Sequence, residues 1–158
     1  MMSEFSFGKR SLDNLVGVAT DLVAVATRAI ALSDVDFGVI EGLRTPERQQ
    51  ELLEAHASQT LQSKHIIGHA IDVAAFVGGT VSWDWPLYPR IAHAMQAASR
   101  EFGIPIVFGC VWDRQLASLT DNIQYEIECY KARRSGKAFL DAGHYELRMA
   151  SGFSSETV

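Results

Sequence analysis

The feature that most constrains the fold is an apolar run, Ala70–Val77, that carries a single carboxylate, Asp72. The run has the length and composition of a buried strand. The pair Gly78-Gly79 that follows is a hairpin turn signal, and it predicts a returning strand over residues 80–83. A lone carboxylate is costly to bury unless it is paired, hydrogen-bonded or bound to a metal ion. Any fold of this chain must therefore bring a partner to Asp72.

Hydrophobic spacing, caps and turn residues predict the other elements. The predicted helices cover residues 11–32, 45–57, 88–102 and 118–134, and the further strands cover 35–42, 104–109 and 143–148. Residues 59–68 lack periodicity and are expected to form a loop, and 150–158 form a polar, mobile tail. Helices mixed with hairpin-joined strands indicate an α+β fold, and 158 residues suit one domain over 1–158.

One cluster of possible partners for Asp72 lies just upstream, where His65 and His69 flank Gly68. Gly68 disfavours a continuous helix across this cluster. A loop histidine at His65 and a strand carboxylate at Asp72 can then reach one point from adjacent segments. The alternative interpretation is a surface histidine, beside an aspartate that bonds only to neighbouring amides.

His69 competes with His65 for this role, because the two are four residues apart like the pair of a helical zinc site. The glutamate that follows the first histidine of such a site is missing, and Gly68 interrupts the spacing. Strand alternation also points His69 to the opposite face from Asp72. We therefore interpret His69 as a neighbour of the site and not as a ligand.

A second cluster lies near the C-terminus and contains Asp141, His144 and Glu146. Two histidines and one carboxylate can hold a zinc ion and leave its fourth position for water. A carboxylate on the turn three residues before a ligand histidine can lie beside that water and take its proton. The working hypothesis is a zinc hydrolase; the alternative is a solvent-exposed turn aspartate and a histidine at the rim.

Together the two clusters resemble a known family of zinc peptidases, the D-alanyl-D-alanine carboxypeptidase and L-alanyl-D-glutamate endopeptidase family. Residues 7–11 and 42–45 look like the small tailed-phage endolysins within it, and the similarity covers roughly residues 5–147. The paired motifs that carry the resemblance are Ser63, His65, Gly68, Ala70 and Asp72, followed by Asp141, His144, Glu146 and Leu147.

The resemblance implies a Hedgehog-like zinc peptidase fold, with a small, mainly antiparallel sheet flanked by helices. It also implies Asp141 as the catalytic base, Arg44 as the group that stabilises the oxyanion, and Ser63 as a substrate-binding residue. The zinc ligands that it implies are His65, Asp72 and His144.

The residues themselves support part of this assignment. Arg44 ends a predicted strand just before a helix, where its guanidinium can offer forked donors to an oxyanion; the alternative is a surface arginine. Ser63 can equally cap local backbone. Glu146, placed among the substrate-binding candidates, can hydrogen-bond either a ligand histidine or a substrate amine.

Two departures from the family pattern concern the wall of the substrate cleft. Relatives carry Gly-x-Asp-Trp before the catalytic turn, whereas here Val111 stands at the aspartate position. The segment 114–139 is also long for the group. Trp83, Trp85 and Trp112 are candidates to line the cleft, with core packing as the alternative for at least one of them.

The resulting prediction is a phage endolysin that hydrolyses a stem-peptide bond of bacterial peptidoglycan, with L-alanyl-D-glutamate as the expected bond and host cell lysis as the result. A D-alanyl-D-alanine carboxypeptidase is the alternative within this chemistry, and a non-catalytic wall-binding module is the alternative outside it. A 2-His-1-carboxylate iron oxygenase is disfavoured because such sites use a close His-x-Asp/Glu pair on a β-barrel.

Composition and charge bear on partners and compartment. A net charge of −5 disfavours binding to nucleic acid, and no signal peptide or transmembrane stretch is visible. We expect a monomer that accumulates in the host cytoplasm, lacks a separate wall-binding domain and reaches the periplasmic wall with the help of a membrane-permeabilising protein. Reduced thiols are expected at Cys110 and Cys129, with a disulfide as the alternative.

Overall fold

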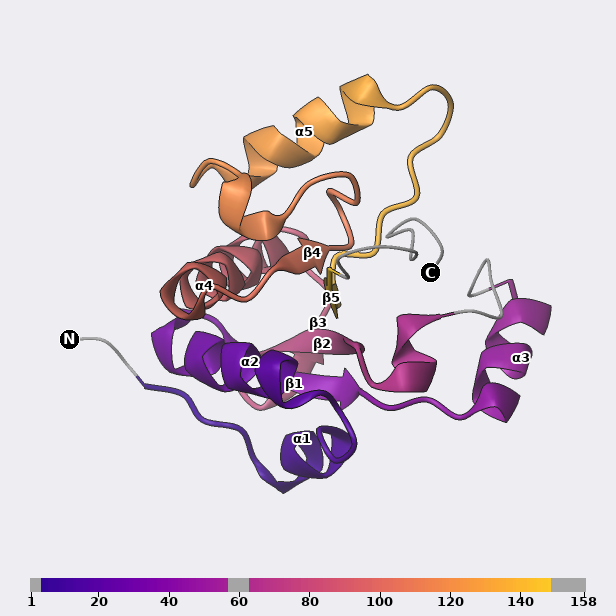
Figure 1. Ribbon diagram of the computed structural model, residues 1–158. Helices are drawn as coiled ribbons and strands as arrows, with labels where there is room; N and C mark the ends of the chain where they lie inside the picture. Colours follow the sequence, from indigo (N-terminus) through magenta and orange to yellow (C-terminus); the bar gives the residue numbers. More distant parts are fainter. Residues whose placement is uncertain (1–3, 57–62, 149–158) are drawn as a thin grey trace.

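The computed structural model describes residues 4–56 and 63–148, which form an α+β fold (Figure 1). The helices are α1 (Lys9–Asn14), α2 (Thr20–Leu32), α3 (Pro46–Glu54), α4 (Leu87–Phe102) and α5 (Ile123–Arg133), with 3-10 turns η1 (Lys64–Ile67) and η2 (Leu116–Ser118). The strands are β1 (Asp36–Glu41), β2 (Ala70–Val77), β3 (Thr80–Ser82), β4 (Ile106–Phe108) and β5 (His144–Leu147). The predicted fold class is confirmed.

All strand pairs of the sheet are antiparallel, and their order is β1-β2-β5-β4, with β3 also paired to β2. Strand β2 is the centre of this arrangement. The hairpin strand β3 pairs with residues 75–77 of β2, while β5, from the far end of the sequence, pairs with residues 70–72. The two most distant parts of the motif pattern therefore become neighbours in the sheet.

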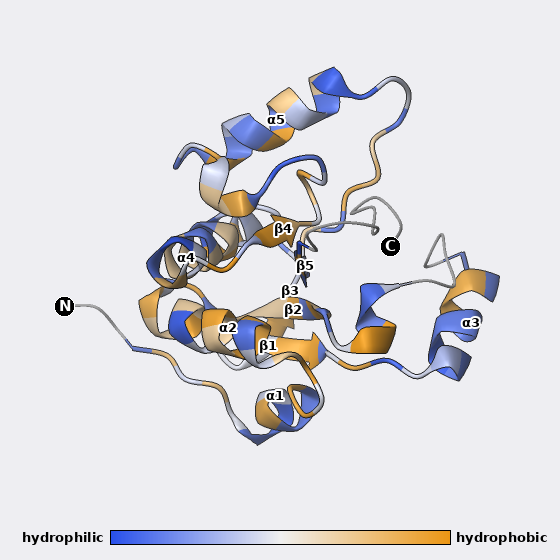
Figure 2. Ribbon diagram, in the orientation of Figure 1, coloured by the Kyte–Doolittle hydropathy of each residue, from blue (hydrophilic) through white to orange (hydrophobic). Residues whose placement is uncertain are grey.

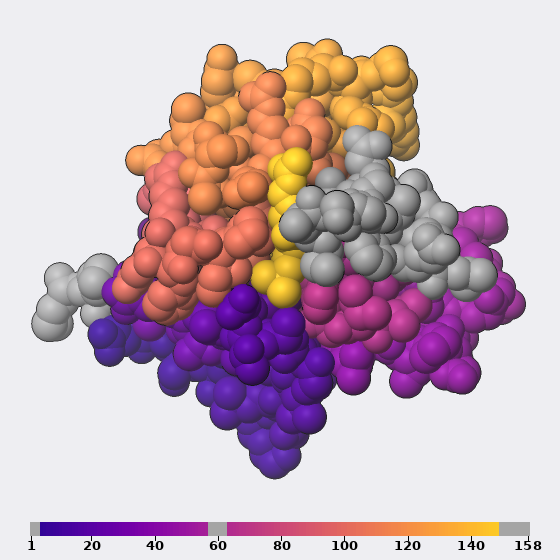
Figure 3. Space-filling view, in the orientation of Figure 1, coloured from indigo at the N-terminus to yellow at the C-terminus, as the bar shows by residue number. Residues whose placement is uncertain are grey.

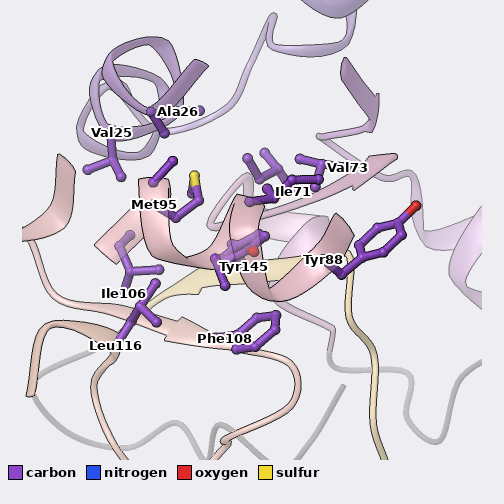
Figure 4. Close-up of a cluster of buried hydrophobic side chains, with 14 of the residues drawn as sticks. Val25, Ala26, Ile71, Val73, Tyr88, Met95, Ile106, Phe108, Leu116 and Tyr145 are labelled. Atoms are coloured by element: carbon purple, nitrogen blue, oxygen red, sulfur yellow. The ribbon is translucent and has the colours of Figure 1, made fainter. Parts of the chain in front are cut away.

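The hydrophobic core lies between one face of the sheet and helices α2 and α4 (Figure 4). Alternate residues of β2, Ile71 and Val73, point into it, as Tyr145 of β5 does, and each is at most 1% exposed. Val25 of α2 and Met95 of α4 pack against them from the helix layer. Figure 2 shows the hydrophobic colour concentrated on β1 and β4, whereas α5 is mixed with hydrophilic residues. The opposite face of β2 carries Asp72 as its one polar side chain, beside Ala70, Ala74 and Phe76.

The prediction of one helix over residues 11–32 is wrong. The chain breaks between α1 and α2 at Gly17, which has a positive φ of 84°. The break lets the amide of Ala19 donate to the carbonyl of Gly68 at 2.8 Å, and a Cβ on Gly68 would overlap the carbonyl oxygen of Gly17. The two glycines therefore allow a close contact that holds η1 against the α1–α2 turn.

The other predicted elements are confirmed, with shifted ends. The β2–β3 hairpin turns through Gly78 and Gly79, both at positive φ, and Thr45 caps α3 by accepting from the amide of Arg48. The helix predicted over 118–134 is shorter, because Asn122 caps α5 and residues 116–118 form η2. Within the loop predicted over 59–68, residues 64–67 form a 3-10 turn; 59–62 and the predicted tail 150–158 lie outside the described residues.

No helix in the described part of the chain is both long enough and apolar enough to span a membrane.

Met95 provides a test of the core. It is 0% exposed on α4, so Met95→Ala removes buried apolar volume and should lower the free energy of unfolding by about 2–5 kcal/mol. Urea denaturation followed by circular dichroism measures the loss. Val16→Ala is the control, because that side chain is 73% exposed and its truncation should change stability by less than about 0.5 kcal/mol. Equal effects of the two substitutions would contradict this assignment of the core.

Candidate metal centre

The register between β2 and β5 places Asp72 directly opposite His144. Their side chains share the sheet face opposite to Ile71 and Tyr145, which are in the core. The Nδ1 atom of His144 lies 3.1 Å from Oδ1 of Asp72. The carboxylate that sequence analysis found in an apolar strand thus has a partner supplied by the far end of the chain.

The second histidine reaches Asp72 from η1. Ser63 begins this turn, its Oγ accepting from the amide of His65 at 3.2 Å, and Gly68 ends it in the left-handed conformation. The Nε2 atom of His65 lies 3.3 Å from Oδ2 of Asp72. On the other side of the ring, Nδ1 lies 2.9 Å from the carbonyl oxygen of Gly42, which can accept a hydrogen bond from it.

His65, Asp72 and His144 each offer one ligand atom, and these atoms lie within 4.8 Å of one another. The Nε2 atom of His65 is buried and has no hydrogen-bond partner within residues 4–56 and 63–148, which is a state that a bound cation relieves. Two imidazole nitrogens and one carboxylate oxygen form a donor set that suits zinc. The group can therefore hold a metal ion, and His69 is not part of it.

The pKa values of Asp72 and His144 are shifted by the groups around them. Burial would raise the pKa of Asp72, but the charge of His65, together with the hydrogen bond and charge of His144, outweighs it and holds the pKa well below its usual range. Burial would likewise lower the pKa of His144, but hydrogen bonds to Asp72 and Glu146 outweigh it and raise the pKa to about 10. Without a metal, a proton on Nδ1 of His144 faces Asp72 in the place of a cation.

Asp141 stands on the turn before β5. Its amide donates to the carbonyl of Gly109 at 2.8 Å, and the amide of Gly109 donates to the carbonyl of His144 at 2.8 Å. A Cβ on Gly109 would overlap the Asp141 carbonyl oxygen, so only glycine permits this approach. Burial and repulsion from Asp72 raise the pKa of Asp141, partly offset by the two histidines and the Gly143 amide. A carboxylate so tuned is suited to general-base chemistry.

Arg44 is 7% exposed and extends over the same carboxylate. Its Nη2 lies 3.5 Å from Oδ2 of Asp72, its Nε donates to Glu41 at 2.7 Å, and its Nη1 donates to Gln49 at 2.6 Å. Sequence analysis missed Glu41 and Gln49. Gln49 is the one buried residue of α3, a position where an apolar side chain is expected, so its polarity hid it from a search for apolar core positions.

Ser63 and Glu146, the two candidates for substrate binding, both contact other residues of the site. Ser63 caps η1, and its Oγ also lies 3.4 Å from Nη1 of Arg44. Glu146 is 2% exposed; its Oε1 lies 2.9 Å from Nε2 of His144 and its Oε2 lies 2.6 Å from Nζ of Lys64. This geometry favours contact with the histidine over contact with a substrate amine. Substrate binding by either residue stays a prediction.

The tryptophans and the unusual Val111 occupy different environments. Val111 is 0% exposed and belongs to the core. Trp112 is also buried: its ring centroid lies 5.1 Å from that of His144, and its Nε1 donates to the carbonyl of Phe139 at 2.9 Å. Trp83 and Trp85 are exposed. Trp112 is therefore a core residue, and its ring also packs against His144, one of the candidate metal ligands.

The segment 114–139 forms η2 and α5, which pack against α4. Cys110 and Cys129 are free thiols, as predicted.

In Figure 3 the yellow residues of β5 lie between the magenta residues around η1 and the salmon-to-orange residues that run from α4 toward α5.

Comparison with known proteins gives one consistent result. A family model described as phage L-alanyl-D-glutamate peptidase matches residues 2–148. The L-alanyl-D-glutamate peptidase of Escherichia phage T5 is 35% identical over 113 residues, which cover 69% of this chain and 82% of that protein. The L-alanyl-D-glutamate peptidase of Listeria phage A118 is 34% identical over 77 residues, covering 47% of this chain and 27% of that protein.

Among solved structures, the L-Ala D-Glu endopeptidase ChiX of Serratia marcescens aligns with a TM-score of 0.71 and 39% sequence identity, over 92% of each chain. The resemblance predicted from the motifs is confirmed, and so is the fold that it implied.

Proton release tests the ligand assignment of His144. Because the pKa of His144 is raised to about 10 without a metal, its Nδ1 should be protonated at neutral pH. Binding of zinc should then release about one proton from this ring, and affinity should rise with pH until the ring is neutral. Calorimetric titrations in two buffers of different ionisation enthalpy measure the release. Identical heats in both buffers would contradict the assignment, and His93→Gln, a change at an exposed histidine, should leave the difference unchanged.

Proposed function

The chain belongs to the phage L-alanyl-D-glutamate peptidase family, and from this membership we propose that it is a zinc-dependent endolysin. Its substrate is the stem peptide of bacterial peptidoglycan, and the bond cleaved joins L-alanine to D-glutamate. The observation that carries the proposal is that His65, Asp72 and His144 offer ligand atoms within 4.8 Å of one another, while Asp141 lies close enough for their charges to shift its pKa. A purely structural metal site has no need of that additional carboxylate.

A zinc ion held by this group supplies Lewis-acid chemistry, which polarises the scissile carbonyl and acidifies water. The chain supplies the proton transfers. Asp141 accepts the proton of the attacking water and passes it to the leaving amine. Its raised pKa suits both tasks, because a weaker acid holds the proton more firmly until the amine takes it.

Arg44 stabilises the negative charge that develops on the carbonyl oxygen. Its guanidinium is already aimed at the carboxylate of Asp72, and Glu41 and Gln49 hold it there, so little reorganisation is needed. Ser63 lies beside Arg44 at the start of η1, where its hydroxyl can contact a bound peptide. We assign Arg44 to oxyanion stabilisation and Ser63 to substrate binding.

The biological setting completes the proposal. One catalytic domain spans residues 1–158 and acts as a monomer. The protein accumulates in the host cytoplasm and reaches the periplasmic wall after a separate membrane-permeabilising protein acts. Cleavage of the stem peptide then causes host cell lysis.

Mass spectrometry of digested peptidoglycan tests the bond. Purified wall incubated with the zinc-loaded protein should yield a new N-terminal D-glutamate. Prior treatment with a chelator should abolish the product, and added zinc should restore it. Release of free D-alanine would instead support the D-alanyl-D-alanine carboxypeptidase alternative, and wall binding without any cleavage would support the non-catalytic module.

Asp141→Asn separates catalysis from metal binding. The substitution keeps the size of the side chain but removes its basicity, so kcat should fall by about 10²–10⁴-fold. Zinc content measured by mass spectrometry should stay at the wild-type level, since Asp141 is not among the three ligand candidates. Asp121→Asn is the matched control, because it changes an exposed carboxylate paired with Arg100. Full lytic activity of Asp141→Asn would contradict the mechanism.

A further inference from the structure

Lys64 and Glu146 form a buried ion pair beside the candidate metal centre. The Nζ atom of Lys64 lies 2.6 Å from Oε2 of Glu146, and the two side chains are only 3% and 2% exposed. The same ammonium group donates a hydrogen bond to the carbonyl oxygen of Leu147 at 2.9 Å. Neither residue belongs to the group that can hold a metal.

The pair joins the two segments that carry the histidine ligands. Lys64 precedes His65 in η1, and Glu146 follows His144 by two residues on the same face of β5. In the sheet, Glu146 pairs with Ala70 of β2, the strand that follows η1. The ion pair and the hydrogen bond to Leu147 thus join η1 to β5.

Glu146 also sets the orientation of the His144 ring. Its Oε1 lies 2.9 Å from Nε2 of His144, while Nδ1 of the same ring faces Asp72. An anionic acceptor at Nε2 keeps the proton on that nitrogen and leaves Nδ1 as the ligand atom. Contacts therefore run from Lys64 to Glu146 to His144.

A buried ion pair is weak evidence for stability, because desolvation of two charges offsets much of their attraction. An apolar pair of similar size would often serve the fold equally well. The position of this pair points to another role. It neutralises Glu146, which would otherwise be an uncompensated buried charge, and so allows an anionic acceptor to stand behind a ligand histidine.

We propose that the Lys64–Glu146 ion pair is a positioning device that pre-forms the metal centre. It fixes the distance between the segments bearing His65 and His144 and selects Nδ1 of His144 as the ligand atom. This inference rests on the proposed zinc site. Both residues are positioning residues, acting through His144 and through the packing of η1.

Zinc affinity, measured by competition with a chelating dye, is the primary test. Lys64→Met and Glu146→Gln should each weaken zinc binding by about 10–100-fold, the range usual for loss of a partner behind a ligand histidine. If Lys64 acts through Glu146, adding Lys64→Met to the Glu146→Gln protein should change the affinity by less than about twofold. Unchanged affinity in both single variants, or additive losses in the double variant, would overturn the proposal.

The double variant also guards against misfolding. Each single substitution leaves one charge buried without its partner, whereas Lys64→Met/Glu146→Gln removes both charges and should fold. If the single variants do not fold, zinc affinity of the double variant decides alone: a loss of about 10–100-fold supports the proposal and wild-type affinity overturns it. Lys131→Met is the matched control, because its ion pair with Glu128 is exposed and should leave zinc affinity unchanged.

Cobalt substitution supplies a second readout. The visible absorption of a cobalt-loaded centre depends on ligand geometry, so the spectrum of the double variant should differ from that of the wild type. A role limited to general stability would lower the melting temperature and leave the spectrum unchanged. Failure of the wild-type protein itself to bind zinc would refute the proposed function, whereas wild-type binding with unaffected variants refutes only this inference.

Discussion

The pairing of β2 with β5 in a single register is the constraint on which the candidate site depends. It sets Asp72 opposite His144 and sends Ile71 and Tyr145 to the other face, into the core. A slip of one residue would exchange the two faces of β5, burying a histidine among apolar side chains and turning the tyrosine outward. The core and the site therefore specify the same register, and neither can be correct without the other.

Charge at the site is balanced by groups that come from separate segments. Asp72 faces His65 from η1, His144 from β5 and Arg44 from the loop after β1. Beside Asp72, β1 carries a register shift between Val39 and Glu41, which brings Glu41 opposite Asp72. Such irregularities commonly re-aim a side chain next to an active site. Here the shift places Glu41, which accepts a hydrogen bond from Arg44, so the irregular pairing of β1 helps to hold Arg44 beside Asp72.

Sequence alone could predict the parts of the fold that depend on local chemistry. The β2–β3 hairpin followed from two glycines, and the need of Asp72 for partners followed from its apolar neighbours. The break at Gly17 was missed because apolar spacing continues across it and only the tertiary contact with Gly68 requires it. Lys64 and Gln49 were missed for a related reason: a buried polar side chain is recognisable only when its partners, remote in sequence, are known.

The ligands of the candidate centre also have a consequence for the chain as a polymer. Asp72 and His144 are 72 residues apart, so an ion held by both would close a long loop through β3, α4, β4 and α5. Clips that close long loops restrict the unfolded ensemble most. The metal would then serve as a removable cross-link as well as a reagent, and resistance to unfolding and to proteolysis would follow the supply of free zinc in the surrounding compartment.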